Sequence, residues 1–181
     1  MDIGAVGLNL EDSTGDYANP LFDKALQQDK IRAIREMSNT VGIHLVINAR
    51  TDVVMNNGDY PQYLLEAINR GNAYKEAGAD CIFIPDVGNL GEKSISILVK
   101  EIDAPINLIA GATLPSISEL QEMGVSRVSV GSRPMRAMLS FLRRIAREFM
   151  TKGTYELMSE SFITYSDVNE WFMPKKDVDS S

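Results

Sequence analysis

Two polar clusters, each placed directly after a short apolar run, hold the residue types best suited to chemistry. Glu11 and Asp12 follow the first such run, residues 5–10. Two carboxylates at a strand end could bind a divalent cation, because such cations prefer hard oxygen ligands. Neighbouring strand residues point to opposite faces, so one side chain would face the interior and the other would face away from it. The alternative is structural: Glu11 pairs with a cationic side chain, and Asp12 or Ser13 begins or caps a loop.

The second cluster is Asn48-Ala49-Arg50-Thr51-Asp52, which follows the apolar residues 45–47. Polar and cationic side chains are costly to place inside a fold unless a charged group meets them. The fork of an arginine side chain suits a carboxylate or a phosphate. Arg50 could therefore bind an anionic substrate, form an internal ion pair with Glu11 or Asp52, or do both.

The remaining strand ends carry less chemistry. Asp86 follows the third apolar run, and Gly131-Ser132 before Pro134 offers a phosphate cradle at a helix N-terminus without any fuller signature. The polar segment 13–24 is long enough to act as a lid over a site, and the alternative is an ordinary connection.

The sequence argues against several kinds of catalytic site, cofactor motif and partner. Cys81 lies inside an apolar run and is expected to be a core thiol, and a lone cysteine forms no internal disulfide. The sole histidine, His44, begins the second run, at the wrong end for catalysis, so no His-based triad is expected. No Walker motif or Gly-x-Gly-x-x-Gly occurs. The formal net charge of −7 argues against a nucleic-acid partner, and no apolar run is long enough to span a membrane.

Strand-like and helical patterns alternate along the chain and must position these residues. Short runs rich in β-branched residues predict five strands, at residues 5–10, 43–48, 79–84, 106–110 and 127–131. Helical periodicity fills the intervals, at residues 25–40, 63–77, 94–102, 116–123 and 134–150, with one more helix near 155–162. This alternation predicts parallel strands joined by right-handed crossovers, in a βα barrel or a doubly wound sheet. In both folds the loops that follow the strands, where the two clusters lie, carry the function.

Four stretches together resemble the isocitrate lyase/phosphoenolpyruvate mutase superfamily. They are Gly4–Ser13, Ile47–Asp52, Tyr74–Pro85 and Glu119–Gly131. The resemblance runs from residue 3 to about residue 160. It implies an α/β fold, the (β/α)8 TIM-type barrel, of which residues 1–162 hold strands four to eight and the helices that follow them. On this interpretation the chain is N-terminally truncated, since a full barrel needs about 200 residues or more. Residues 163–181 form a tail with a helix exchanged between subunits, and its end, Asp177–Ser181, is expected to be disordered.

The resemblance also implies a function. Members of the superfamily make or break C–C or P–C bonds in 2-oxo acids and related carboxylates, through an enolate-like intermediate and with Mg²⁺ (Mn²⁺ is an alternative). Glu11 matches the glutamate that supports the metal. Arg50 matches the catalytic arginine that binds the substrate carboxylate. Asn48, Asp86 and Asn19 fall at positions that contact the substrate.

Two departures from the family pattern indicate which subgroup of the superfamily the sequence resembles. The Lys-Lys-Cys-Gly-type loop of the lyases is absent, and Pro85 stands where mutases carry a histidine. The sequence is therefore closer to the broad mutase-like subgroup.

Two hypotheses compete with this interpretation. The chain could be a truncated, catalytically inactive fragment without the metal-binding strands, or an unrelated βα-barrel binding protein. We expect a small carboxylate substrate, a homo-oligomer (dimer or tetramer), no nucleic-acid or membrane partner, and a cytoplasmic location.

Overall fold

The computed structural model describes residues 4–173, apart from residues 87, 89 and 161. The chain divides into two compact units, residues 1–131 and residues 132–181. The predicted boundary after residue 162 stays a prediction, and the predicted disorder at Asp177–Ser181 falls outside the described residues.

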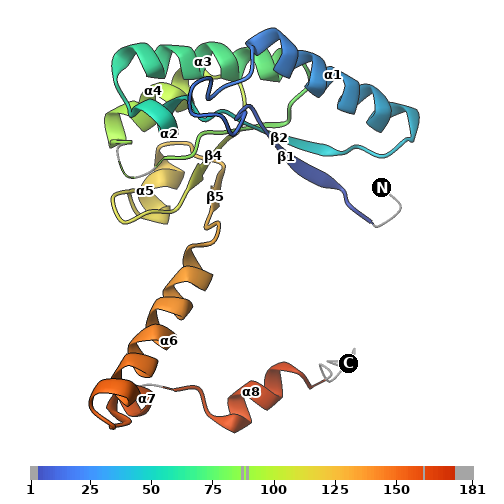
Figure 1. Cartoon of the computed structure of the whole chain (residues 1–181). Coiled ribbons are helices and arrows are strands. Elements are labelled where there is room, and N and C mark those ends of the chain that lie inside the picture. Colours follow the sequence, from blue (N-terminus) through green and yellow to red (C-terminus); the bar gives the residue numbers. More distant parts are fainter. Residues whose placement is uncertain (1–3, 87, 89, 161, 174–181) are drawn as a thin grey trace. The chain divides into compact units, whose positions relative to one another are not determined.

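The first unit is built on a five-stranded parallel sheet whose strands pair in the order in which they occur along the chain (Figure 1). The strands are β1 (Gly7–Glu11), β2 (Val46–Arg50), β3 (Cys81–Phe83), β4 (Ile106–Ile109) and β5 (Arg127–Ser129). The helices that alternate with them are α1 (Lys24–Thr40), α2 (Val53–Asn57), α3 (Pro61–Glu76), α4 (Glu92–Glu101) and α5 (Ile117–Glu122). Five consecutive parallel βα units fit part of a TIM-type barrel, as the sequence predicted.

The two faces of the sheet differ in polarity because successive strand residues point to opposite sides. One face buries Ile47, Ala49, Ile82, Ile106 and Leu108 in a core shared with the helices. The alternate positions carry polar side chains, among them Asn9, Glu11, Asn48, Arg50 and Asn107. Polar groups in this pattern belong on the inner face of a barrel, where function is built.

Several ends of the elements differ from the predicted ones, and one short helix was not expected. β2 begins at Val46 rather than at residue 43, because the Ser38 hydroxyl binds the backbone just before it. The Ser38 Oγ donates to the Ile43 carbonyl at 2.6 Å and accepts from the Leu45 amide at 2.9 Å. The short helix α2, directly after the second polar cluster, was not predicted at all, since five residues show too little periodicity.

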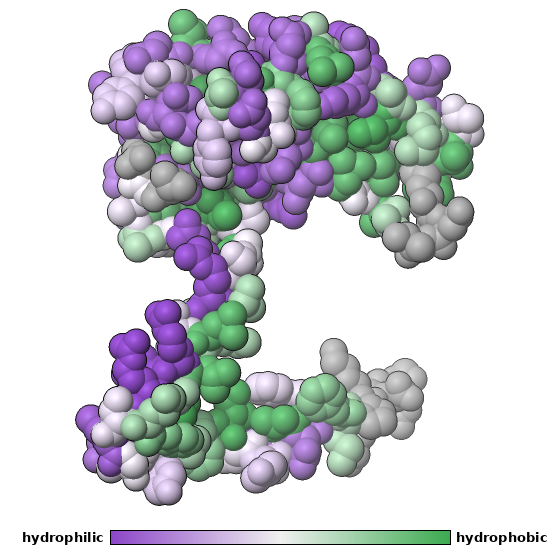
Figure 2. Space-filling model, viewed as in Figure 1, coloured by the Kyte–Doolittle hydropathy of each residue, from purple (hydrophilic) through white to green (hydrophobic). Residues whose placement is uncertain are grey.

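The second unit contains α6 (Arg133–Thr151), α7 (Glu156–Glu160) and α8 (Tyr165–Trp171). Apolar side chains line α6 but stay exposed, including Met135, Met138 and Leu142 (Figure 2). The turn after α6 is organised by Glu148, whose carboxylate accepts from the amides of Glu156 and Leu157 at 2.8 and 3.0 Å. None of the helices in the described part of the chain has the length and apolar character that a bilayer crossing requires.

Candidate active site at the carboxyl ends of β1 and β2

The two polar clusters meet at one edge of the sheet. β1 and β2 are parallel neighbours, and their register places Glu11 beside Arg50. Both residues are the last of their strands, so both lie at the carboxyl-terminal edge, where parallel α/β proteins place their sites. The ion pair between Glu11 and Arg50, which the sequence offered as one alternative, is therefore present.

Arg50 is held by carboxylates on two sides. Its Nε and Nη2 donate to Asp52 Oδ1 and Oδ2 at 2.6 and 3.0 Å, and Nη1 lies 3.0 Å from Glu11 Oε2. Nη2 also points at the Met55 sulfur, and the guanidinium lies 5.6 Å from the centre of the Phe83 ring. Within the described residues these contacts engage four of the five N–H donors. Both ion pairs offered as alternatives from the sequence are present together.

The charge of Arg50 is secured by these partners. Burial by itself would lower the pKa of Arg50, but the hydrogen bond and charge of Asp52, with the charge of Glu11, outweigh it and raise that pKa. A permanently charged fork at a half-buried strand end is suited to a second, exogenous carboxylate. Glu11 itself occupies the accessible edge of the fork, so a ligand must share Nη1 with it or displace it.

Glu11 and Asp12 point to opposite sides, as the alternation of a strand requires. The Glu11 side chain is half exposed, whereas Asp12 is completely buried. Asp12 Oδ1 accepts from the Asp52 amide at 3.0 Å, and its Oδ2 accepts from Arg70 and Tyr74. The two adjacent carboxylates therefore do not form a chelating pair, and Asp12 is neither a metal ligand nor a simple loop cap.

The described residues do not by themselves fit a magnesium ion. They contain no group of three or more His, Cys, Asp or Glu side chains that could hold a metal. At this edge, Glu11 and Asp52 are both engaged by Arg50, and Asp12 is turned into the core. Glu11 is the one member of the first cluster that could reach a metal, after leaving Arg50.

Asn48 and Asp86 lie near the same edge with different surroundings. Asn48 is buried and donates through Nδ2 to Asn9 Oδ1 at 2.7 Å, while its Oδ1 has no hydrogen-bond partner among the described residues. On β2 it shares the inner face with Arg50, two residues away. Asp86 is also buried, and its Oδ2 accepts from the amides of Gly88 and Leu90 at 2.8 and 3.1 Å. Asp86 thus shapes the loop after β3.

Asn19 lies in the loop that follows β1, which closes on itself. A bridge joins Ser13 to Leu21, and the Thr14 amide donates to the Pro20 carbonyl at 3.0 Å. Asn19 is exposed, and its carbonyl accepts from the Thr14 hydroxyl. Among the described side chains there is no contact between Asn19 and Arg50, so a substrate contact by Asn19 stays a prediction.

Arg70 and Tyr74 are members of the site's surroundings that sequence reasoning missed. Both lie on α3 and are buried, together with Ala67 and Ala73 of the same helix. The sequence does contain a signal for them. Arg70 and Tyr74 are one helical turn apart on the face that carries small apolar residues, and polar groups on a buried face need polar partners. The partner, Asp12, lies 58 residues away from Arg70 in the sequence.

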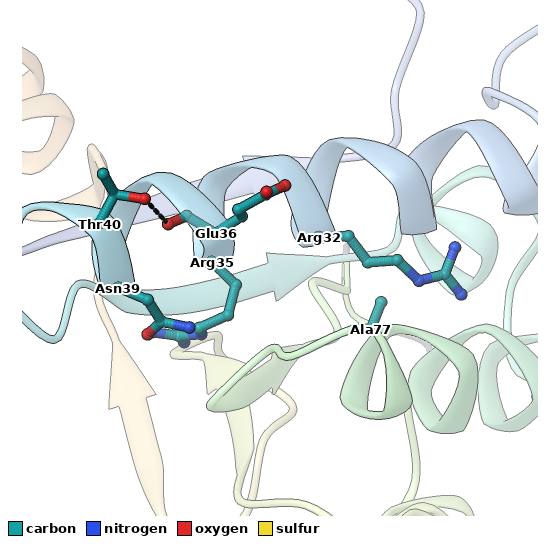
Figure 3. A pocket seen from close by; sticks show the side chains of 6 residues that line it. All are labelled: Arg32, Arg35, Glu36, Asn39, Thr40 and Ala77. Carbon is teal, nitrogen blue, oxygen red and sulfur yellow. Dashed lines mark hydrogen bonds between the residues drawn. The ribbon is translucent and has the colours of Figure 1, made fainter.

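A surface pocket of about 570 Å³ lies elsewhere, between α1 and the end of α3 (Figure 3). Its Arg35 donates to the Gly78 carbonyl at 2.8 Å and pairs with Asp80, which also accepts from His44 at 2.9 Å. These residues precede β2 and β3, so they lie at the amino-terminal edge of the sheet. His44, as predicted, is at the end away from the candidate site. Cys81, also as predicted, is buried, and burial raises the pKa of its thiol.

Comparisons with known proteins place this geometry in a family. The phosphoenolpyruvate phosphomutase family model matches residues 1–150. The petal death protein of Dianthus caryophyllus is 32% identical over 94% of this chain and 54% of its own length. The 2-methylisocitrate lyase of Halalkalibacterium halodurans is 32% identical over 83% of this chain and 48% of its own. The chain thus spans about half the length of the curated relatives it matches.

Solved structures agree on the fold. A lyase/mutase-like protein from Burkholderia cenocepacia J2315 superposes with a TM-score of 0.84 over 96% of this chain and 61% of that one, at 29% identity. A phosphonomutase-like protein from the same organism gives a TM-score of 0.73 over 81% of this chain and 59% of that one, at 31% identity. Taken with the family match, these likenesses show that the chain belongs to the phosphoenolpyruvate phosphomutase family, within the isocitrate lyase/phosphoenolpyruvate mutase superfamily.

Proposed function

We propose that the protein binds a small 2-oxo acid or related carboxylate at Arg50 and takes part in C–C or P–C lyase or mutase chemistry. The observation that carries the proposal is the Arg50 fork at the end of β2. Asp52 holds one edge of the guanidinium through two hydrogen bonds, and a carboxylate, that of Glu11, already lies on the other. The accessible edge of Arg50 is therefore shaped for a carboxylate ligand.

The relatives support the class of reaction. A 2-methylisocitrate lyase and a phosphoenolpyruvate phosphomutase from Streptomyces hygroscopicus are both similar to this chain, at 32% and 28% identity. Their names span a lyase and a mutase, so they do not choose between the two for this protein. An enolate-like intermediate would carry negative charge, and a fixed guanidinium stabilises such charge where it develops.

The proposed roles follow from the positions of the side chains. Arg50 binds the substrate carboxylate and is the catalytic residue. Asn48 shares its face and brings a buried carbonyl oxygen that is unpaired within the described residues. Asp86 and Asn19 are proposed as further substrate contacts, on the third strand end and on the loop after β1.

Dependence on Mg²⁺, or Mn²⁺ in its place, is a proposal that rests on family membership. A solved phosphonopyruvate hydrolase complex with oxalate and Mg²⁺ shares the fold at 24% identity, with a TM-score of 0.72. In the described part of this chain, Glu11 is the carboxylate proposed to support the metal, and it is paired with Arg50. Because these residues alone do not form a metal site, we derive no step through the ion.

A second candidate function is carboxylate binding without turnover. The described residues lack a cluster of three metal-binding side chains, which favours this alternative. Binding without turnover would still use Arg50, so the two candidates share the ligand and differ in their response to metal.

Calorimetric titration with oxalate, a planar dicarboxylate that resembles an enolate, tests both. We expect the wild-type protein to bind oxalate and Arg50→Ala to lose about tenfold or more in affinity, since a charged hydrogen bond contributes about 1.5–3 kcal/mol. Arg32→Ala, at an exposed arginine of α1 that pairs only with Asp29 among the described residues, is the matched control. Stronger binding with Mg²⁺ present would support the metal-dependent enzyme, and equal binding would support the ligand-binding alternative. Absence of oxalate binding to the wild type would refute both.

Assembly is a separate part of the proposal. We propose that the chain forms a dimer or tetramer through the tail 163–181, in which Trp171, Phe172 and Met173 are exposed. Exposed apolar side chains in such number commonly mark an interface. Deleting residues 163–181 should lower the mass measured by light scattering, and an unchanged mass would refute the role of the tail.

A further inference from the structure

The buried carboxylate of Asp12 lies at the centre of a network directly beneath the candidate site. Its Oδ1 accepts from the Asp52 amide at 3.0 Å. Its Oδ2 accepts from the Tyr74 hydroxyl at 2.8 Å and from Arg70 Nη1 at 3.1 Å. A buried ion pair of this kind adds little net stability compared with apolar residues of similar volume. The contacts of Asp12 instead position two neighbouring segments of the chain.

One arm of the network leads to Arg50. The amide that Asp12 holds belongs to Asp52, and the Asp52 carboxylate grips Arg50 through two hydrogen bonds. The Asp12 amide in turn donates to the Arg50 carbonyl at 3.0 Å. Asp12 thus fixes the backbone on both sides of Thr51, and the direction of the Asp52 carboxylate depends on it.

The other arm leads to the loop after β1. Arg70 Nη1 donates to the Phe22 carbonyl at 2.9 Å, and the Phe22 amide donates to the Asp12 carbonyl at 2.8 Å. Phe22 follows directly after the bridge between Ser13 and Leu21 that closes this loop. The same guanidinium therefore ties the base of the loop to the residue that holds Asp52.

Helix α3 provides these groups from one face. Glu66, Arg70 and Tyr74 are spaced four residues apart, so they lie one above the other along the helix. Glu66 Oε1 accepts from Arg70 Nε at 2.7 Å and so orients the guanidinium. Burial and the neighbouring Asp12 charge raise the pKa of Tyr74, so its hydroxyl keeps the proton that it donates to Asp12.

We propose that Arg70 and Tyr74 are positioning residues, which act through Asp12 to aim the Asp52 carboxylate at Arg50 and to fix the base of the loop at residues 13–21. The inference rests on the proposed function, because it assigns Arg50 a ligand. A network that only stabilised the fold would show no link between the amide of Asp52 and ligand affinity.

Tyr74→Phe is the central variant, because it removes one donor to Asp12 and leaves the charge of Arg70 in place. Tyr63→Phe is the matched control: it removes a hydroxyl from the same helix, from a ring that packs edge-on against Tyr60 and belongs to no contact of the network. Hydrogen exchange at the Asp52 amide, measured without ligand, and oxalate affinity by calorimetry are the two readouts. We expect Tyr74→Phe to melt cooperatively, to exchange at Asp52 about tenfold faster, and to bind oxalate about threefold or more weakly, because it loses the hydrogen bonds of the Tyr74 hydroxyl to Asp12 and Arg70. Tyr63→Phe should change neither.

Arg70→Lys separates the two arms. A lysine keeps a positive charge near Asp12 but has no planar fork to reach Asp12, Glu66 and the Phe22 carbonyl together. We expect protection of the Asp52 amide to be largely retained and exchange in residues 13–22 to become faster. If Tyr74→Phe does not fold, Arg70→Lys tests the loop arm of the network, and unchanged exchange in residues 13–22 of this variant would overturn the inference.

The outcomes distinguish the inference from the proposed function. Unchanged exchange at Asp52 in folded Tyr74→Phe overturns the inference, whether or not oxalate binds. Faster exchange with unchanged oxalate affinity also overturns it, because the network is then a stability element only. If the wild type does not bind oxalate, the proposed function fails and the positioning of Arg50 for a ligand fails with it. Faster exchange at the Asp52 amide in Tyr74→Phe would then still show that the contacts of Asp12 were assigned correctly.

Discussion

The two edges of the sheet each hold a partly buried arginine, and they use it differently. At the amino-terminal edge, Arg35 of α1 donates to the carbonyls of Gly78 and Leu45 and pairs with Asp80. At the carboxyl-terminal edge, the contacts of the Arg50 guanidinium within the described residues are with side chains, those of Glu11, Asp52, Met55 and Phe83. Backbone carbonyls cannot turn away, whereas an exposed glutamate can. Arg35 thus joins α1 to the backbone that precedes β2 and β3, whereas we propose that Arg50 exchanges one of its partners, Glu11, for a ligand.

Asp12 extends this comparison to the carboxylates. Asp80 is held by Arg35, His44 and the Ile47 amide, and Asp12 by Arg70, Tyr74 and the Asp52 amide. Each edge therefore has one carboxylate that joins a backbone amide, within β2 or just after it, to an arginine on a helix. Among the described residues, a second arginine, Arg50, is tied to such a carboxylate at the carboxyl-terminal edge, through Asp52, and this is the edge at which we propose ligand binding.

Removing the positive charge that pairs with Asp12 should have the largest effect on the free energy of unfolding. Arg70→Met leaves the Asp12 carboxylate buried without its cation, which costs about 3–5 kcal/mol when a buried pair is broken in this way. Urea denaturation followed by circular dichroism measures the loss. Lys75→Met, at an exposed position of the same helix, is the control and should change stability by less than about 0.5 kcal/mol. A loss below about 1 kcal/mol for Arg70→Met would contradict the account of Asp12.

Removing the charge of Asp80 at the amino-terminal edge should lower the free energy of unfolding by less, and the loss should depend on pH. Although burial opposes its ionisation, the Ile47 amide and the side chains of Arg35 and His44 hold the pKa of Asp80 below its ordinary value. Asp80→Asn should cost about 2 kcal/mol, the range for a hydrogen bond to a charged group. A lowered folded-state pKa means that the ionised form contributes fully above the unfolded pKa, near about 3.9. This contribution is lost as pH falls through the folded value.

Denaturant titrations at several pH values measure this dependence. The difference between wild type and Asp80→Asn should shrink as the pH falls below about 4. Asp29→Asn removes an exposed pair with Arg32 and should cost less than about 0.5 kcal/mol. A difference that grew on acidification would reverse the sign and refute the assignment to Asp80.

Removing the charge of Glu11, the exposed partner of Arg50, should have the smallest effect, which is a change in oxalate affinity. Glu11→Gln removes the charge that competes with a ligand for Nη1, so oxalate without metal should bind about two- to fivefold more tightly, as expected for a partly exposed ion pair. If Glu11 instead supports a metal, the same variant should weaken the Mg²⁺-dependent part of binding. Calorimetry with and without Mg²⁺ separates the two contributions. Unchanged affinity under both conditions would remove Glu11 from the site.

Much of the fold could be read from the sequence because its signals are local. The five apolar runs predicted all five strands, and glycines at helix ends, such as Gly78 and Gly124 with positive φ, marked the joints between helix and strand. α2 was missed, and β2 was started three residues early, at Ile43, because the Ser38 hydroxyl competes for that backbone. Such side-chain competition depends on where another helix ends, which local patterns do not contain.

The candidate site was predicted in part for the same reason. The sequence by itself placed Glu11 and Arg50 just after two predicted parallel strands, at the edge that carries function, since that edge follows from the βα alternation. It also determined that Glu11 and Asp12 face opposite ways, because strand side chains alternate. Only the tertiary structure decided which of the two is buried and by what it is held. That depends on α3, whose Arg70 and Tyr74 reach Asp12 across 58 and 62 residues of chain. A buried charge must find its partners in space, and periodicity along the chain does not encode them.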